Sequence, residues 1–342
     1  MKKKIFIAFV VLVVAVGVAG MWAYQNFFGS AVEERFSLVL RSDESYDDMV
    51  AKVERYIERD LAFKLYAKRI NLDEGIEAGT YTFDKGMTVI EVARTLKFGC
   101  DNSVRLVINN ARTPEALAGK IAMQIDADSV SMLAALRSET LIKEFGFDSA
   151  EAMFSIFLPN TYEVWWTVSP EQLISRMQRE YEAFWTAERQ AKAKAKGLTP
   201  YEVQVLASIV ASETNRRDEH PLIASLYLNR LRKGIPLQAC PTVIYAHGLN
   251  DPQMFKTRRV LKRHLAYDSP YNTYKYRGLP PTPIRLTRPD VLDAVLNAPK
   301  TDYLYMCANP DFSGTHVFSS SYAKHSATAR QYQRELNQRK IK

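Results

Sequence analysis

The stretch TPYEVQVLASIVASET (199–214) decides how the C-terminal part of the chain folds. Thr199 is of the type that caps a helix, and Pro200 suits the first helical position. Glu202 stands where a capping box places its acid. Apolar residues then recur at three- and four-residue spacing, which predicts a helix with one buried face.

Glu213 falls on that apolar face, four residues after Ile209 and three after Val210. Burying a charge costs several kcal/mol unless the charge is paired or neutralised. Burial and the negative end of the helix dipole both favour the protonated carboxyl group, so the pKa of Glu213 should rise, as a general acid requires. A buried glutamate held by a cation such as Arg216 or Arg230 explains the same pattern, and periodicity alone does not separate the two readings.

Beyond this helix the pattern continues as α+β. We expect a second helix that Asp218 caps and Gly234 ends. Two strands should follow at 303–308 and 316–318, joined by a turn, and a polar helix from about residue 322 should close the chain.

Toward the N-terminus, short strands alternate with capped helices and predict a small α+β region. Residues 126–198 are mostly of helical pattern. Neither region gathers residue types that carry catalysis, so packing or carbohydrate binding is the natural role of the first. The strand patterns lie at 36–40, 80–83 and 104–108, and the helix starts at Ser45, Thr88 and Thr113-Pro114.

The first thirty residues predict a membrane anchor. The core IFIAFVVLVVAVGVAGMWAY (5–24) has 20 residues, and no charge follows Lys4 until Glu33. About 20 apolar residues cross a hydrocarbon layer, and the lysines before them favour a cytoplasmic N-terminus. A cleaved signal peptide has a shorter apolar region and a small-residue cleavage site. We therefore expect a single-pass protein of the inner (cytoplasmic) membrane with everything after residue 30 on the periplasmic side.

Composition excludes several classes of protein. The 342 residues carry a formal charge of +8, but there is no run of five or more Lys/Arg, so we expect no nucleic acid partner. The histidines (220, 247, 264, 316 and 325) show no metal-ligand spacing, and no motif for a nucleotide or for a serine nucleophile is present. We expect no metal and no cofactor, and we take His316 as a structural or substrate-contacting residue.

Several long segments resemble the endolytic murein transglycosylases of the YceG-like (MltG) family, and the resemblance covers nearly the whole chain. The strongest are ASIVASET (207–214), LIASLYLNRLRKGIPLQACPTVIYAHG (222–248), SPYNTYKYRGLPPTPI (269–284) and TDYLYMCANPDFSGTHVFS (301–319). Weaker matches are EAGTYTFDKGMTVIEV (77–92) and FLPNTYEV (157–164).

The resemblance implies an enzyme that cuts peptidoglycan glycan strands between MurNAc and GlcNAc and leaves 1,6-anhydro-MurNAc ends, in cell wall assembly and remodelling. It carries the family's essential glutamate onto Glu213. Relatives often have an acid where this chain has Ala211, and an aspartate where it has Cys240. Because the 6-hydroxyl of muramic acid acts as an internal nucleophile, one acid/base can serve both steps. Candidate sugar contacts are Asn229, Gln238, Thr242, Tyr245, Tyr271 and Asn272.

The expected organisation is α+β, with one transmembrane helix, a LysM-like subdomain and a catalytic domain. A muramidase that hydrolyses the same bond, or a non-catalytic glycan-binding scaffold for wall synthases, are the rival functions. Penicillin-binding proteins or other wall synthases are the expected protein partners. The expected parts are the cytoplasmic tail and anchor (1–30), the LysM-like α+β region (31–125), a helical linking region (126–198) and the catalytic domain (199–342).

Overall fold

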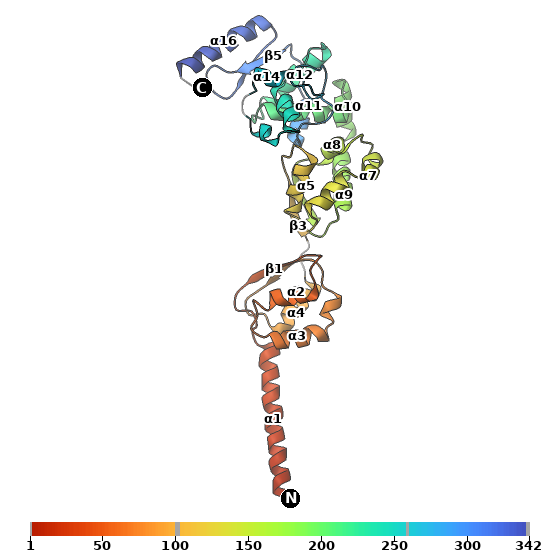
Figure 1. Ribbon diagram of the computed structural model, residues 1–342, viewed down its shortest axis with the longest axis vertical. Helices are drawn as coiled ribbons and strands as arrows, with labels where there is room; N and C mark the ends of the chain where they lie inside the picture. Colours follow the sequence, from red (N-terminus) through yellow and green to blue (C-terminus); the bar gives the residue numbers. More distant parts are fainter. Residues whose placement is uncertain (1, 100–102, 258–259, 340–342) are drawn as a thin grey trace. The chain divides into compact units, whose positions relative to one another are not determined.

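The computed structural model describes residues 2–99, 103–257 and 260–339, and the chain divides into two compact units (Figure 1). The first unit consists of Met1–Arg105, Gln124–Asp126 and Glu163–Val168, and the second of all other residues. The mixed α+β class expected from the sequence is confirmed. The domain boundaries at residues 30, 125 and 198 stay a prediction.

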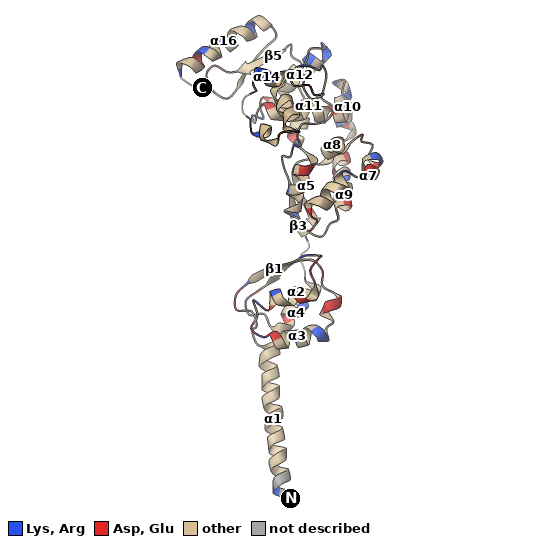
Figure 2. Ribbon diagram, in the orientation of Figure 1, with Lys and Arg blue, Asp and Glu red and all other residues tan. Residues whose placement is uncertain are grey.

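The chain begins with helix α1 (Lys2–Phe28), whose segment Phe6–Phe28 is long and apolar enough to cross a membrane. Its large apolar side chains, such as Phe9 and Leu12, are exposed to the surroundings. Figure 2 shows that charged residues are confined to the start of this helix. By length and composition α1 could be a membrane anchor or a signal sequence.

The rest of the first unit is a small α+β body. Its strands β1 and β2 are antiparallel, with Leu38 opposite Tyr81 and Phe36 opposite Phe83. Alternate side chains of β2 are buried against the helices. The arrangement agrees with the expected α+β region, while its likeness to LysM stays a prediction. Its elements are β1 (Phe36–Leu40), α2 (Tyr46–Val53), α3 (Asp60–Arg69), η1 (Leu72–Glu74), β2 (Gly79–Phe83) and α4 (Val89–Phe98).

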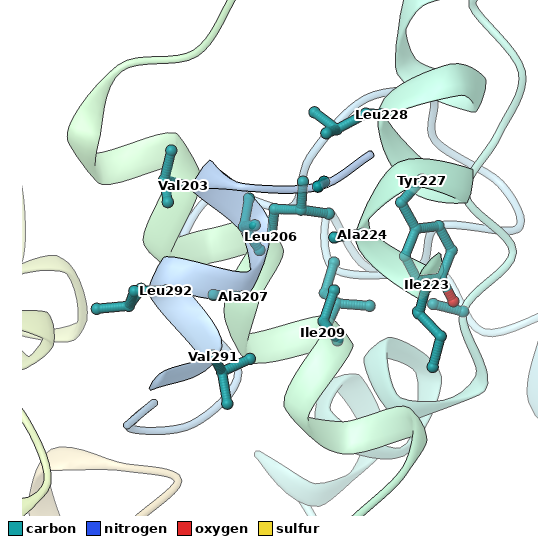
Figure 3. Packing of buried hydrophobic residues seen from close by; sticks show 14 of the residues in the cluster. Val203, Leu206, Ala207, Ile209, Ile223, Ala224, Tyr227, Leu228, Val291 and Leu292 are labelled. Atoms are coloured by element: carbon teal, nitrogen blue, oxygen red, sulfur yellow. The ribbon is translucent and has the colours of Figure 1, made fainter. Parts of the chain in front are cut away.

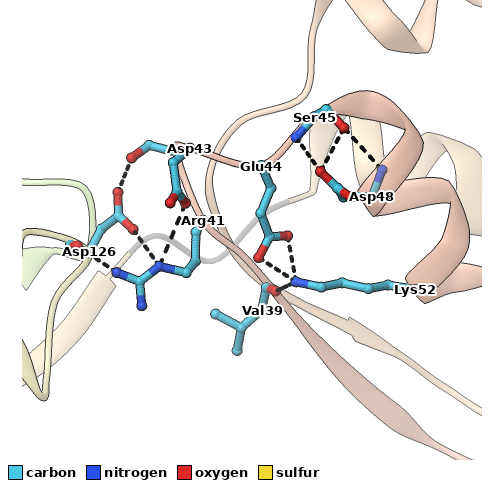
Figure 4. Close-up of polar contacts among 9 residues, drawn as sticks. Val39, Arg41, Asp43, Glu44, Ser45, Asp48, Lys52 and Asp126 are labelled. Atoms are coloured by element: carbon cyan, nitrogen blue, oxygen red, sulfur yellow. Dashed lines mark hydrogen bonds and ion pairs between the residues drawn. The ribbon is translucent and has the colours of Figure 1, made fainter.

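Helix α2 begins where the sequence predicts, because Ser45 and Asp48 form a reciprocal capping box (Figure 4). The capped turn is tied to the neighbouring strand by Lys52, which contacts Glu44 and the carbonyl of Val39. Thr88 and Glu91 form a second capping box at the start of α4. Capping boxes of this kind satisfy backbone N–H groups that a helix start otherwise leaves unpaired.

The second unit carries most of the helices, and the remaining strands pair as β3–β4 and β5–β6. Strands β5 and β6 are antiparallel, with Ala308 opposite His316, and confirm the hairpin expected there. The elements from residue 103 onward are β3 (Ser103–Ile108), α5 (Pro114–Ala122), α6 (Ser129–Leu136), α7 (Glu139–Glu144), α8 (Ala150–Met153), η2 (Phe154–Ile156), β4 (Asn160–Trp165), α9 (Pro170–Phe184), α10 (Ala187–Ala195), α11 (Pro200–Glu213), α12 (His220–Arg232), α13 (Cys240–Gly248), η3 (Pro252–Lys256), α14 (Lys262–Leu265), α15 (Pro289–Leu296), β5 (Tyr305–Ala308), β6 (His316–Ser319) and α16 (Tyr322–Gln338).

The core of the second unit lies where α11, α12 and α15 pack together (Figure 3). Leu206 and Ile209 of α11, Ile223 of α12 and Leu292 of α15 are fully buried there. Burial of side chains of this size stabilises the fold by roughly 1.5–3 kcal/mol each. The core therefore fixes α11, and with it the position of Glu213 at the end of that helix.

One detail of the expected helix start is wrong. Asp218 does not cap α12, which begins at His220 with Glu219 at the capping position and no side-chain cap. Asp218 instead accepts a hydrogen bond from Arg216 at 2.9 Å. The end of α12 is as expected, because Gly234 takes the left-handed conformation (φ 62°) just beyond the helix.

Candidate active site

Glu213 is the last residue of α11, and the start of that helix is fixed as the sequence predicts. The Thr199 N–H donates to Glu202 Oε2 at 2.8 Å, and the Glu202 N–H donates to Thr199 Oγ1 at 3.2 Å. From Val203 to Val210 every residue is buried. The capped start and the buried residues therefore fix the course of the helix and place Glu213 at its end.

The carboxylate of Glu213 is bound by a neutral hydroxyl group. The Tyr227 hydroxyl of α12 donates to Glu213 Oε1 at 2.5 Å. Among the residues that the structure describes, no cation pairs with Glu213. Arg216 is paired with Asp218, and Arg230 donates to the backbone carbonyls of Pro236, Leu237 and Leu304. The alternative interpretation, in which Arg216 or Arg230 pairs with Glu213, is therefore wrong.

This environment favours the protonated acid. Desolvation raises the pKa of Glu213 above its ordinary value, while the Tyr227 hydrogen bond and the charge of His316 partly oppose the rise. Desolvation and the nearby Glu213 charge in turn raise the pKa of Tyr227 well above its ordinary value. Tyr227 therefore stays a hydrogen-bond donor at neutral pH, and Glu213 is suited to give and take a proton.

Glu213 lines a pocket with a volume of about 280 Å³. Polyhydroxyl rings bind to surfaces that combine aromatic faces with a few polar groups, and this wall has both. Glu213 is the only carboxylic acid on the wall in the described part of the chain. The lining residues are Glu213, Leu226, Tyr227, Arg230, Leu237, Gln238, Cys240, Tyr274, Tyr305, Met306 and His325.

Arg230 lines this pocket and holds several of its segments together. Besides its bonds to carbonyl groups, its guanidinium lies 5.4 Å from the centre of the Tyr305 ring. Burial lowers the pKa of Arg230, and the nearby tyrosines oppose that change. Through these contacts the Arg230 side chain connects α12 to the segment before α13 and to strand β5. Cys240 lies on the same pocket wall, with its Sγ 3.1 Å from the Tyr274 hydroxyl.

Of the six predicted sugar contacts, Gln238 lines the Glu213 pocket. Its backbone is in the left-handed region (φ 52°), which costs a residue other than glycine roughly 1–3 kcal/mol. The Gln238 N–H donates to the carbonyl of Thr273 at 3.0 Å, and its side-chain oxygen accepts from Arg230 at 3.3 Å. These two bonds hold the strained residue in place, so its side chain is presented to the pocket in one orientation. Its contact with sugar stays a prediction.

The other five residues do not line this pocket, and their polar groups are engaged within the protein. Asn229 donates to the carbonyls of Thr301 and Tyr303, which ties α12 to the segment before β5. Asn272 donates to the carbonyls of Leu265 and Tyr267.

Thr242, Tyr245 and Tyr271 belong to the same supporting layer. Thr242 bonds to the Thr273 hydroxyl at 2.9 Å, and Tyr271 bonds to the Thr282 hydroxyl at 2.7 Å. The rings of Tyr245 and Tyr271 pack edge to face, with centroids 4.9 Å apart. In this structure these residues hold the segment that carries Tyr274, and their contact with sugar stays a prediction.

Sequence reasoning did not single out Tyr227, Tyr274 or Tyr305, although all three lie within segments that carry the family resemblance. Tyr227 is 14 residues from Glu213 along the chain and meets it only because α11 packs on α12. No local spacing signals such a contact. The aromatic residues in the segments 222–248, 269–284 and 301–319 were the available clue.

His316 has a structural partner close to this site. Its backbone N–H donates to Glu219 Oε1 at 2.6 Å, and its Nδ1 lies 2.9 Å from Glu219 Oε2. This pair fastens β6 to the start of α12. In the described part of the chain no group of three or more His, Cys, Asp or Glu residues is placed to hold a metal ion.

Comparisons with known proteins agree with one another. A model of the YceG-like family matches residues 38–331. An endolytic murein transglycosylase of Bacillus subtilis is 28% identical over 305 residues, which cover 85% of this chain and 82% of that protein. A protein of the same name from Streptococcus pneumoniae is 24% identical, over 90% of this chain and 61% of its own length. The crystal structure of a YceG-like protein from Listeria monocytogenes matches with a TM-score of 0.58 and 25% identity, covering 86% of this chain and 98% of that one.

Proposed function

Because the chain belongs to the YceG-like family, we propose that it is a lytic transglycosylase that cleaves the glycan strands of peptidoglycan. Two relatives that it matches over most of its length are named endolytic murein transglycosylases. The observation that carries the proposal is Glu213, a carboxyl group of raised pKa that faces a pocket and is bound by a neutral donor.

In the first step Glu213 gives its proton to the glycosidic oxygen between MurNAc and GlcNAc. The bond from C1 of MurNAc to that oxygen breaks, and the GlcNAc side leaves with a hydroxyl group. A protonated carboxyl group is required at the pH of the reaction, and desolvation favours that form by raising the pKa of Glu213. Tyr227 stays protonated and stabilises the carboxylate that this step creates.

In the second step the 6-hydroxyl of the same MurNAc attacks C1, and its proton passes to Glu213. The new bond joins C1 to O6, so the product is a 1,6-anhydro-MurNAc end and no water is consumed. Attack within one sugar ring gains from proximity, and a single acid/base is enough for both steps. Glu213 is returned to its protonated form.

Hydrolysis of the same bond by a muramidase usually needs a second carboxyl group in the site. Hydrolytic glycosidases generally use two carboxyl groups, either about 5–5.5 Å or about 6.5–9.5 Å apart. Glu213 is the only carboxylic acid on the described wall of this pocket, and Cys240 lies on that wall where the family resemblance implies an aspartate. A single carboxyl group on the pocket wall therefore supports transglycosylation over hydrolysis.

The test is cleavage of purified glycan strands by the wild-type protein and by Glu213→Gln. We expect shorter strands from the wild type and a loss of about 10²–10⁴-fold in the variant, the usual cost of losing a general acid/base. Cys307→Ala is a suitable control because Cys307 is a free thiol that does not line the pocket. A wild type that binds strands without cutting them would instead indicate a glycan-binding scaffold.

We also propose that α1 remains attached and anchors the protein in the cytoplasmic membrane, with everything after residue 30 on the periplasmic side. Lys2, Lys3 and Lys4 precede the apolar segment, which favours a cytoplasmic N-terminus. A membrane position would bring the enzyme near penicillin-binding proteins or other wall synthases. A reporter fused after Lys342 should be active only outside the cytoplasm, and the mature protein should keep residues 1–30.

A further inference from the structure

The second unit has another pocket beside the end of α11, and the proposed chemistry does not use it. Its volume is about 440 Å³, within the range of ligand-binding clefts. Ala211 and Thr214 line it, whereas Glu213 lines the pocket described above. Residues two apart on an α-helix point about 200° away from each other. The two pockets therefore open on different sides of the helix end.

Arg285 gives this second pocket an uncompensated positive charge. One of its Nη atoms donates to the carbonyl of Ala211 at 3.3 Å, and its buried Nε has no hydrogen-bond partner. No carboxylate of the described residues forms an ion pair with it. Desolvation lowers the pKa of Arg285, and the charges of Arg112 and Arg288 lower it further. A half-buried guanidinium whose Nε is shielded from water is costly without a counter-charge, and an anion would offset that cost.

The neighbouring positive charges differ in how far they are neutralised. Arg288 is bound to Asp290, which is also near Arg217. Arg112 lies over the ring of Phe255, 5.1 Å from its centre, and no described carboxylate pairs with it. The region around Arg285 therefore keeps a net positive charge, which attracts anions into the pocket.

The rest of the wall is suited to a peptide. The pocket is lined by Arg285 together with Asn109, Asn110, Asn160 and Asn215. Amide groups can donate to and accept from peptide groups, and a guanidinium binds a carboxylate with two parallel hydrogen bonds. Val107, Ile108 and Leu286 add apolar surface. This combination fits a short acidic peptide better than a neutral sugar.

We propose that Arg285 and the surrounding amides bind a carboxylate of the peptide that MurNAc carries in peptidoglycan. The inference rests on the proposed function, because it assumes that a glycan strand occupies the Glu213 pocket. A helix with its side chains is about 10–12 Å wide. An extended peptide of four residues spans roughly 13–14 Å. A peptide attached to a strand at Glu213 is therefore long enough to pass the helix end and reach Arg285.

The experiment compares strands that keep their peptides with strands from which an amidase has removed them. Arg285→Gln should raise KM for peptide-bearing strands by at least about tenfold, the loss expected from one charge-assisted hydrogen bond. On peptide-free strands it should equal the wild type. Arg176→Gln, which removes the same charge from a surface ion pair with Glu180, should change neither. Equal losses on both substrates, or no loss on either, would overturn the assignment.

Binding of a free peptide separates this assignment from the proposed reaction. By calorimetry, the wild-type protein should bind an acidic tetrapeptide more tightly than the same peptide with amidated carboxyl groups, and Arg285→Gln should lose that preference. A wild type that cuts no strands but shows the preference would refute the reaction and keep the anion site. No preference in the wild type would refute the site, even if the variant fails to fold. Competition by inorganic phosphate at concentrations similar to the peptide would show a general anion site and also overturn it.

Discussion

Replacing Tyr227 by Phe removes the hydroxyl that donates to Glu213 Oε1 at 2.5 Å and leaves the ring in the core. The hydrogen bond favours the ionised form of Glu213, so its loss raises the pKa of that residue further. A hydrogen bond to a charged group contributes about 1.5–3 kcal/mol. That free energy corresponds to a factor of roughly 10 to 150 in the ratio of protonated to ionised Glu213.

The assay is the pH dependence of kcat/KM on purified glycan strands. If protonated Glu213 is the acid, kcat/KM falls as pH rises through the pKa of this residue in the free enzyme. The Tyr227→Phe profile should therefore keep its activity to higher pH than the wild-type profile. At its optimum the variant should be slower, because the carboxylate formed in the first step has lost a stabilising donor.

A matched control is Tyr181→Phe, since Tyr181 is a partly buried tyrosine packed against the same core but contacts Trp185 rather than Glu213. Its profile should coincide with that of the wild type. A Tyr227→Phe profile that also coincides with the wild type would refute the reasoning, and so would a shift to lower pH.

Three further predictions concern stability and the departures from the family pattern. The pKa of Glu213 is raised in the folded protein above its ordinary value of 4.5, which we take for the unfolded chain. Between the unfolded and the folded pKa the folded state therefore binds more protons, and the unfolding free energy falls as pH rises through this range. Glu213→Gln should therefore gain in unfolding free energy over the wild type as pH rises above 4.5, which urea titrations at several pH values will measure. Cys240→Ala should keep most of the activity, because a free cysteine acts as a small apolar residue, and a hundredfold fall in kcat/KM, about 2.7 kcal/mol, would show that the thiol or its contact with Tyr274 is needed. Glu219→Ala should lower the unfolding free energy by about 3 kcal/mol through loss of its two hydrogen bonds with His316, and a change below about 0.5 kcal/mol would contradict that role.

Local signals predicted the elements of the fold well. A capping box needs two residues three positions apart, so Thr88 with Glu91 and Thr199 with Glu202 could be recognised from the sequence and are present in the structure. The simpler expectation that Asp218 caps a helix failed, because a neighbouring arginine offered its carboxylate a competing partner. The choice between two local partners depends on side-chain geometry that spacing does not contain.

The site was only partly predictable, for a similar reason. The position of Glu213 on an apolar helix face identified a carboxyl group worth attention, and desolvation does raise its pKa. Its partner Tyr227 comes from another helix, and the packing of the two helices cannot be read from either one alone. Residue type was a weak guide to sugar contacts, because an amide such as Asn272 can equally satisfy buried carbonyl groups.

The most direct measurement of the central claim is mass spectrometry of the ends that the wild-type protein leaves on defined glycan strands. If Glu213 is the sole acid/base and the MurNAc 6-hydroxyl is the nucleophile, the new ends lack one water relative to reducing ends, and Glu213→Gln makes almost none of them. Reducing ends as the main product would show that water is the nucleophile. Unchanged cleavage by Glu213→Gln would show that another residue transfers the proton.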